Sequence, residues 1–283
     1  MHLSLGLTFI PPLLIAYRSQ GFWMTTNTYM EQPDVTFKKQ LMLILNKPQP
    51  GEFLAWSTYS NFNSLLDQNS IRIPIVSSVE SDVNGDGKFD QLNFTVSIPL
   101  ESTESITSFG LLLIFDYKLY RMSTLQMETL AYISHSSVSA GSSFVAYGDL
   151  RLYQKTPLRH RGVDTRFNTT IVDSADSSAS TYDLSTIFSA YSQRNLTTQF
   201  LNKYPVWKSG RGAQQPFTIE VIISYPTETI TYQPGFWELI KWGWVQYVTI
   251  LLLFLWVFRK INIAVFSEQL FNTVIVHPKI KRH

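Results

Sequence analysis

The 283-residue sequence contains no cysteine, which excludes disulfide bonds, thiolate zinc ligands and cysteine nucleophiles. A chain of this length can bury one sizeable core without such cross-links. The formal net charge is only +2, and no basic stripe interleaved with aromatic residues is present, which argues against nucleic acid as a partner. We therefore expect one main domain that is stabilised by burial.

The sequence also lacks the short motifs of common catalytic sites. It has no GxSxG elbow, no HExxH helix, no P-loop and no GxGxxG fingerprint. Scattered acids and hydroxyls occur in any domain, so enzymatic activity has no support in the residues. We predict a protein that is not an enzyme and has no catalytic residues.

What the sequence does have is apolar residues concentrated at its two ends. Residues 242–258 carry no charge and have aromatic residues near both limits of the run. At about 1.5 Å per residue, such a run covers most of a bilayer core of roughly 30 Å, and aromatic rings favour the headgroup level. The run predicts a transmembrane helix; a buried helix of a soluble domain rarely stays free of charge over this length.

The charges that follow this run predict the orientation of the chain. The tail holds one acid, Glu268, and five basic residues: Arg259, Lys260, Lys279, Lys281 and Arg282. An excess of Lys and Arg is typical of the cytosolic side of a membrane. We therefore expect a cytosolic C-terminus and an exoplasmic middle domain.

The N-terminal stretch of residues 1–17 is also apolar, but Pro11 and Pro12 interrupt it. Three interpretations are open: a cleaved signal peptide, a buried strand, or an incomplete, proline-kinked transmembrane helix. A signal peptide would have a basic start and a clear cleavage site, and both are missing. The trio at residues 21–23 repeats the Gly-Phe-Trp trio at residues 235–237. The repetition favours the helix, because both trios would then lie at the same membrane interface.

Between these ends, apolar residues alternate with polar ones at period two, which predicts half-buried strands. The alternation covers residues 35–43, 92–100 and 217–223, and further runs that favour β structure lie at 72–76, 109–120, 143–153 and 166–172. Leu184, Ile187, Phe188 and Tyr191 instead recur at helical spacing, with Thr181 or Asp183 as a cap.

The expected fold class is therefore mainly β: an antiparallel β-sandwich-like exoplasmic domain with a short helix, flanked by N- and C-terminal transmembrane helices. The expected parts are an N-terminal transmembrane segment (1–23), the exoplasmic β-rich domain (24–235), the C-terminal transmembrane helix (236–260) and a basic cytosolic tail (261–283). Within the second span, Gly243, Gln246 and Thr249 are small or polar, and such residues often face another helix. That helix is either the first segment or part of another subunit.

Three glycosylation sequons lie inside the segment that the charges place outside the cytosol, at Asn93, Asn168 and Asn195. A single three-residue motif arises often by chance, but three in the expected segment support the topology. Asn93 falls on the polar side of its alternating strand, which leaves room for a glycan.

The run DVNGDGKFD at residues 82–90 resembles a calcium loop. Oxygen-bearing groups stand at the ligand spacing, namely the side chains of Asp82, Asn84, Asp86 and Asp90 and the carbonyl of Lys88. The twelfth position holds Asn93 where such loops have a bidentate Glu, and the flanks favour strands, which argues against an EF-hand. A weak structural calcium site and a metal-free polar hairpin both remain open.

Five stretches of the chain carry a resemblance to a known family. They are IPPLLIAYRSQGFW (10–23), FLAWST (53–58), GDLRLYQK (148–155), AYSQRNLTT (190–198) and YQPGFWELIKWGWVQYVTILLLFLWVF (232–258). These stretches closely resemble the transmembrane protein 231 family, and the similarity covers nearly the whole chain.

The resemblance implies a two-span protein of the ciliary membrane at the transition zone. It implies a subunit of the Meckel syndrome complex, in a hetero-oligomeric assembly with tectonics, B9-domain proteins and other transition-zone membrane proteins. The family acts in assembly of a diffusion barrier that controls ciliary membrane protein composition, and thereby ciliogenesis and Hedgehog signalling. More apolar sequence precedes the Ile-Pro-Pro motif in the family, so we expect a truncated first span here.

Two other functions remain as alternatives. Calcium at residues 82–90 could order the edge of a cell-surface receptor or adhesion module, whose binding would then depend on calcium. Two spans around a large exoplasmic domain also occur in channel subunits, but the lack of charge in the second span argues against an ion path.

Overall fold

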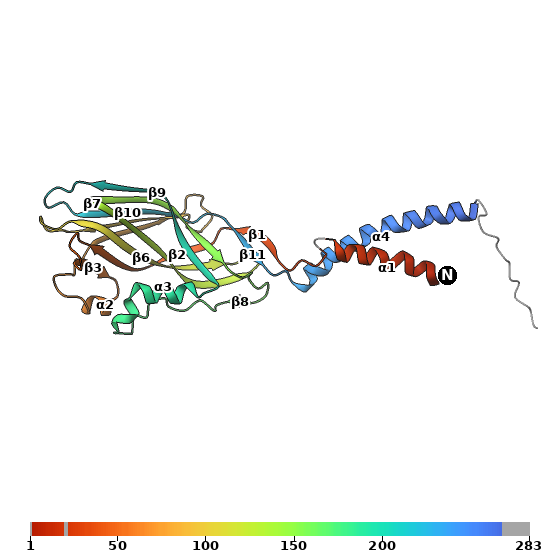
Figure 1. Ribbon diagram of the computed structural model, residues 1–283, viewed down its shortest axis with the longest axis horizontal. Helices are drawn as coiled ribbons and strands as arrows, with labels where there is room; N and C mark the ends of the chain where they lie inside the picture. Colours follow the sequence, from red (N-terminus) through yellow and green to blue (C-terminus); the bar gives the residue numbers. More distant parts are fainter. Residues whose placement is uncertain (1, 20–21, 268–283) are drawn as a thin grey trace, which may run out of the picture. The chain divides into compact units, whose positions relative to one another are not determined.

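The computed structural model describes residues 2–19 and 22–267. Gly21 of the first aromatic trio, and Glu268, Lys279, Lys281 and Arg282 of the predicted basic tail, lie outside the described residues. The chain divides into two compact units, Thr26–Gln233 and a second formed by Met1–Thr25 with Pro234–His283. Strands dominate the first unit and helices the second (Figure 1), so the prediction of a mainly β protein is confirmed.

The β-rich unit holds eleven strands and three short helices in its described residues. The strands are β1 (Asn27–Glu31), β2 (Asp34–Asn46), β3 (Phe53–Ser57), β4 (Ile75–Ser81), β5 (Gln91–Ile98), β6 (Ile106–Leu119), β7 (Thr124–Gln154), β8 (Val163–Asp164), β9 (Leu196–Ser209), β10 (Phe217–Ser224) and β11 (Glu228–Tyr232). The helices are α2 (Ser60–Ser64), the 3-10 helix η1 (Ala179–Tyr182) and α3 (Leu184–Ser192).

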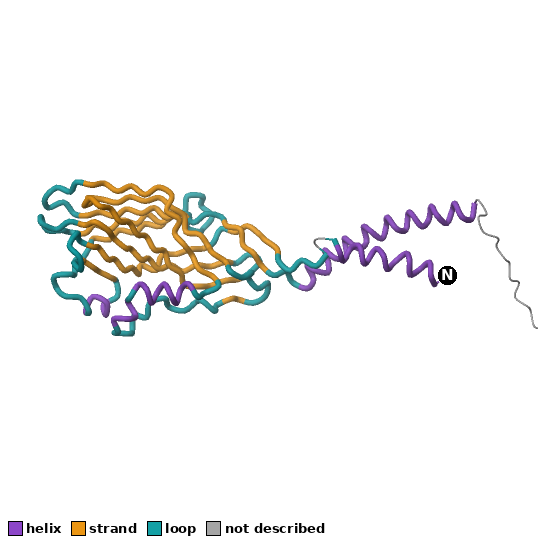
Figure 2. The backbone as a smooth tube through the Cα atoms, in the orientation of Figure 1, coloured by secondary structure: helices purple, strands orange, loops and turns teal. Residues whose placement is uncertain are grey.

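Nine of these strands form one curled sheet, visible as the orange layers in Figure 2. Its order is β3-β2-β6-β7-β10-β5-β4, with β8 and β9 also paired to β7. Most neighbours are antiparallel, but β10 and β8 run parallel to β7. The sheet is therefore mixed, which corrects the prediction of a purely antiparallel arrangement; period-two patterns show faces but carry no information on strand direction.

The long strand β7 bends sharply in the middle and joins the two halves of the sheet. Its first half pairs with β6, and its second half lies between β9 and β10. The rings of His135 and Phe144 are 5.2 Å apart, whereas nine residues of straight strand would span about 30 Å. At the bend, a Cβ on Gly141 would stand 2.3 Å from the Trp207 ring, so only glycine fits there.

Two groups of buried side chains hold the unit together. The main core combines inward residues of β2 and β6 with those of β5 and β10, including Leu113, Phe115, Phe94 and Val221. A second cluster lies on the opposite face of β2 and β6, where Tyr182 of η1 and Ile187 and Tyr191 of α3 cover Leu112 and Ile114 of β6. At about 25 cal/mol per Å² of apolar surface, burial on both faces of β6 is the main source of stability.

The alternating segments predicted as strands lie in β2, β5 and β10, and the helical spacing in α3. The alternation in β2 breaks at a bulge, where Lys39 has a φ of 58° and its side chain is exposed although its neighbours Phe37 and Leu41 are buried. The segment 166–172 was predicted as a strand, and this was wrong. It is an irregular loop, in which the carbonyls of Phe167 and Thr169 accept hydrogen bonds from the Arg194 guanidinium.

The second unit contains two helices, α1 (His2–Arg18) and α4 (Phe236–Ser267). α1 contains Pro11 and Pro12, and its helical form excludes the alternative of a buried strand for this segment. Within the part of the chain that the structure describes, one helix is long and apolar enough to cross a membrane: residues Phe236–Val265 of α4. The C-terminal apolar helix is confirmed; it begins at the predicted residue, Phe236, and continues beyond the predicted end to Ser267.

Candidate functional site

The predicted calcium loop is a hairpin whose acidic side chains turn toward backbone amides. The two carboxylate oxygens of Asp82 accept hydrogen bonds from the N–H groups of Gly85 and Gly87, at 2.7 and 2.9 Å. Both glycines have positive φ, 72° and 85°, as tight polar turns require. Asn84 and Asp86 bind backbone N–H groups two residues further along in the same way, each at 2.9 Å.

Asp90 fixes the base of this hairpin. Its carboxylate accepts the side-chain amide of Gln32 and the N–H of Val83, each at 2.7 Å, and these hydrogen bonds hold the pKa of Asp90 below its ordinary value. The Lys88 ammonium donates to the Gln32 carbonyl at 2.8 Å. Among residues 2–19 and 22–267, no group of three or more acids or histidines is arranged to hold a metal. The geometry favours the metal-free hairpin, and calcium binding stays a prediction.

The three sequon asparagines occupy different surroundings. Asn93 is exposed on β5, opposite Ile222 of β10 and Val79 of β4, and Asn168 is exposed in the loop after β8. Asn195 is only half-exposed, and Thr197, the third residue of its sequon, is 6% exposed because it belongs to the buried part of β9. Two of the three sites therefore offer an accessible amide in the folded chain.

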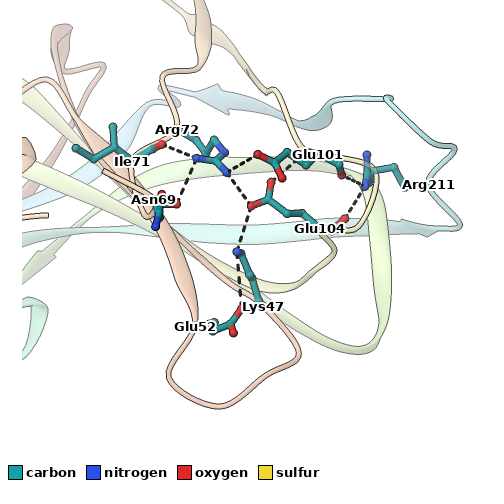
Figure 3. A network of polar contacts seen from close by, with 8 residues as sticks. All are labelled: Lys47, Glu52, Asn69, Ile71, Arg72, Glu101, Glu104 and Arg211. Carbon is teal, nitrogen blue, oxygen red and sulfur yellow. Dashed lines mark hydrogen bonds and ion pairs between the residues drawn. The ribbon is translucent and has the colours of Figure 1, made fainter. Parts of the chain in front are cut away.

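A network of charged residues at the loops after β2, before β4 and between β5 and β6 is shown in Figure 3. Its centre is Glu104, 8% exposed, whose carboxylate lies 3.1 Å from Lys47 and 2.9 Å from Arg72. Arg211, from the loop between β9 and β10, donates to the Glu101 carbonyl at 2.7 Å. Burial raises the pKa of Glu104, but the Glu101 N–H, Lys47 and Arg72 outweigh it, and the pKa lies below its ordinary value. The network ties four loops together.

A second buried acid, Glu128 of β7, joins the second core cluster to a loop. Its carboxylate lies 2.5 Å from the Lys38 ammonium and accepts the Ile171 N–H at 2.6 Å. Beside it, the Tyr191 hydroxyl of α3 hydrogen-bonds to Thr129 at 2.7 Å and accepts the Thr198 N–H at 2.7 Å. These contacts fix α3 and the irregular loop on the sheet. No pattern in the sequence pairs Lys38 with Glu128, because each lies in a different strand.

A third acidic pair lies in the separate two-stranded sheet of β1 and β11. Glu31 and Glu228 stand opposite each other in the register and are 7% and 6% exposed. Glu31 accepts the Tyr120 N–H at 2.8 Å, and Glu228 accepts the Leu152 N–H at 2.8 Å. Burial raises the pKa of Glu228 to about 7, against the opposing effects of Leu152 and Arg151. Asn27 and Tyr232 pair at the other end of this sheet, so the chain enters and leaves the β-rich unit at one place.

In the helical unit, two of the three small or polar residues of α4 contact the N-terminal segment. The Ser19 hydroxyl donates to the Gln246 side chain at 3.2 Å, and a Cβ on Gly243 would stand 3.4 Å from the Phe22 carbonyl. Thr249 instead donates to the Val245 carbonyl of its own helix at 2.7 Å. Gly243 and Gln246 therefore contact the N-terminal segment, which was the first of the two partners considered for them; the other was a helix of another subunit.

A mainly β unit joined to an apolar helix of spanning length defines a membrane protein with an extramembrane β domain. Comparison with known sequences is more specific. Residues 1–275 match the family described as Transmembrane protein 231. Transmembrane protein 231 of Gallus gallus is 49% identical over 273 residues, covering 96% of this chain and 85% of the relative.

The relatives from Rattus norvegicus and Homo sapiens, both named Transmembrane protein 231, are each 48% identical over 275 residues. Each alignment covers 97% of this chain and 87% of the relative. The chain belongs to the Transmembrane protein 231 family, which confirms the predicted resemblance. The names of these relatives describe a transmembrane protein and not an enzyme.

Proposed function

We propose that this chain is a non-enzymatic scaffold subunit of the ciliary transition zone. In this role it joins tectonics, B9-domain proteins and other membrane proteins in a hetero-oligomeric complex. The complex contributes to the diffusion barrier that controls ciliary membrane protein composition, and thereby to ciliogenesis and Hedgehog signalling. Membership of the Transmembrane protein 231 family over residues 1–275 is the observation that carries this proposal.

The proposed topology has two spans, α1 and α4, a β domain on the exoplasmic side and a cytosolic C-terminus. Arg259 and Lys260, which directly follow the uncharged run of residues 242–258 in α4, support this orientation, because basic residues concentrate on the cytosolic side. The exposed amides of Asn93 and Asn168 support an exoplasmic β domain that carries glycans.

The buried ion pairs support a scaffold role for the β domain. Glu104 binds Lys47 and Arg72 of two other loops, and Glu128 binds Lys38 of β2 and the N–H of Ile171 in the loop after β8. Such contacts hold the loops in one conformation, and a binding surface with little freedom to lose on association gains affinity from that rigidity. The scaffold would thus present preformed surfaces to its partners.

The test is expression of this chain, with a tag, in ciliated vertebrate cells from which their own Transmembrane protein 231 has been removed. The tagged chain should concentrate at the base of the cilium, restore ciliogenesis and label tectonics and B9-domain proteins in a proximity assay. A matched control replaces α4 by an unrelated apolar helix of equal length and keeps the β domain. Diffuse plasma-membrane signal and no labelling of these partners by the unaltered chain would contradict the proposal.

A further inference from the structure

The helical unit contains an apolar groove that the family assignment does not explain. The groove has a volume of about 410 Å³ and is lined mainly by Leu13, Phe22 and Trp23 of the N-terminal segment and by Gly243, Trp244 and Tyr247 of α4. Trp23 and Trp244 are 64% and 63% exposed, so aromatic surface on both sides faces outward. We propose that this groove binds a sterol.

A glycine lies where the two segments that line the groove come close together. Gly243 and Trp244 lie three and four residues after Ile240, and Tyr247 lies four and three residues after them, so all four lie on one face of α4. Gly243 has no side chain, and a Cβ there would stand 3.4 Å from the Phe22 carbonyl and 3.5 Å from its ring. Edge contact with the Tyr17 ring, at 5.9 Å between centroids, holds Phe22 in this position. The aromatic side chains that line the groove from both segments suit a rigid fused-ring ligand.

The rim and the local sequence provide the polar contacts that a sterol needs. Tyr247 carries a hydroxyl, and the Ser19–Gln246 hydrogen bond lies one residue away along α4. Of these groups, the Tyr247 hydroxyl lines the groove and can bind the single hydroxyl of a sterol. Lys241, Tyr247 and Leu251 follow the order and spacing of basic, aromatic and aliphatic residues proposed for sterol contact in membrane helices. Tyr247, the central residue of this pattern, also lines the groove.

A sterol suits the groove better than a phospholipid acyl chain for an entropic reason. Binding immobilises every freely rotating bond of an acyl chain, whereas the fused rings of a sterol are already rigid. The groove also lies at the start of the apolar run, where aromatic rings mark the headgroup level and an amphiphile with one hydroxyl resides.

The test uses the full chain in phosphatidylcholine nanodiscs with a photoreactive cholesterol analogue. The label should map to the peptide around residues 236–251, and excess cholesterol should remove it. Trp244→Ala should reduce labelling about five-fold, as expected for one lost aromatic contact. The matched control is Trp256→Ala, which removes an equally exposed tryptophan outside the groove and should leave labelling unchanged.

Gly243→Leu places a side chain inside the groove and should abolish labelling. If that leucine disturbs the packing of the two helices, Trp244→Ala still tests the proposal. Equal labelling of the Trp244→Ala and Trp256→Ala variants would overturn the sterol site. So would a photoreactive phosphatidylcholine that labels the same peptide with the same dependence on Trp244, because the occupant would then be an acyl chain. The readout needs no cilium, so its result is independent of the transition-zone proposal.

Discussion

The buried carboxyl of Glu228 should make the β domain less stable as the pH rises. Glu228 is 6% exposed, faces Glu31 across the β1–β11 pair and has a pKa raised from 4.5 to about 7, chiefly by burial. Between these two values the folded chain keeps a proton that the unfolded chain has released. Stability therefore falls as pH rises through this window, and the penalty is complete above the folded pKa.

The magnitude follows from the size of the shift. A difference of about 2.5 pKa units corresponds to about 3 kcal/mol between the protonated and ionised forms, at 1.36 kcal/mol per unit. Glu228→Gln supplies a neutral side chain whose carbonyl can still accept the Leu152 N–H. The variant should match the wild type near pH 4 and exceed its unfolding free energy by up to about 3 kcal/mol near pH 8.

The assay is pulse proteolysis of the full chain in detergent across a urea series, which reports the fraction of unfolded β domain at each pH. Glu220→Gln is the matched control, because Glu220 is an exposed acid on the neighbouring strand β10. It should leave the pH profile unchanged. A Glu228→Gln variant whose advantage over the wild type is the same near pH 4 and pH 8 would refute the assignment of the raised pKa to this carboxyl.

Three further outcomes are expected. Gly141→Val should lower the unfolding free energy by more than about 2 kcal/mol in urea titration, because its Cβ would overlap the Trp207 ring, and an unchanged midpoint would contradict the bend geometry. Millimolar calcium should leave the melting temperature unchanged if the loop is a metal-free hairpin, whereas a rise that Asp82→Asn abolishes would establish the calcium site. Asn93→Gln should remove one glycan-sized mobility shift from the chain expressed in secretory cells, and an unshifted band would show that Asn93 carries no glycan.

The parts of the fold that were predictable from sequence are those that depend on neighbours along the chain. The apolar run of α4, the alternation in β5 and β10 and the helical spacing of α3 are local patterns, and each lies in the expected element. β9 was not predicted, because it is an edge strand with most of its central residues exposed on both faces, so no alternation arises. The parallel pairing of the second half of β7 with β10 was also not predictable, because an alternating pattern does not indicate which strand is the partner or in which direction it runs.

The buried acids were beyond prediction for a different reason. Glu104, Glu128 and Glu228 look like ordinary surface acids in the sequence, and the partners that bind them come from distant strands and loops. The predicted loop at residues 82–90 shows the opposite case. Its spacing of Asp and Asn left a calcium loop and a metal-free polar hairpin both open, because spacing alone does not show whether the oxygens face a cation or the backbone.

The position of Glu228 gives its charge a consequence for the whole β domain. β1 and β11 form a two-stranded sheet, and pairs of strands are marginal in water by themselves. The Tyr29 and Tyr232 rings, 5.4 Å apart, and the bridge from Leu158 to Tyr232 stabilise one end of the pair. The acids lie at its other end. The chain enters the β domain through β1 and leaves it through β11, toward α4. Glu228, whose ionised form is the least favourable of the buried carboxylates, therefore lies in the strand pair that connects the β domain to the helical unit.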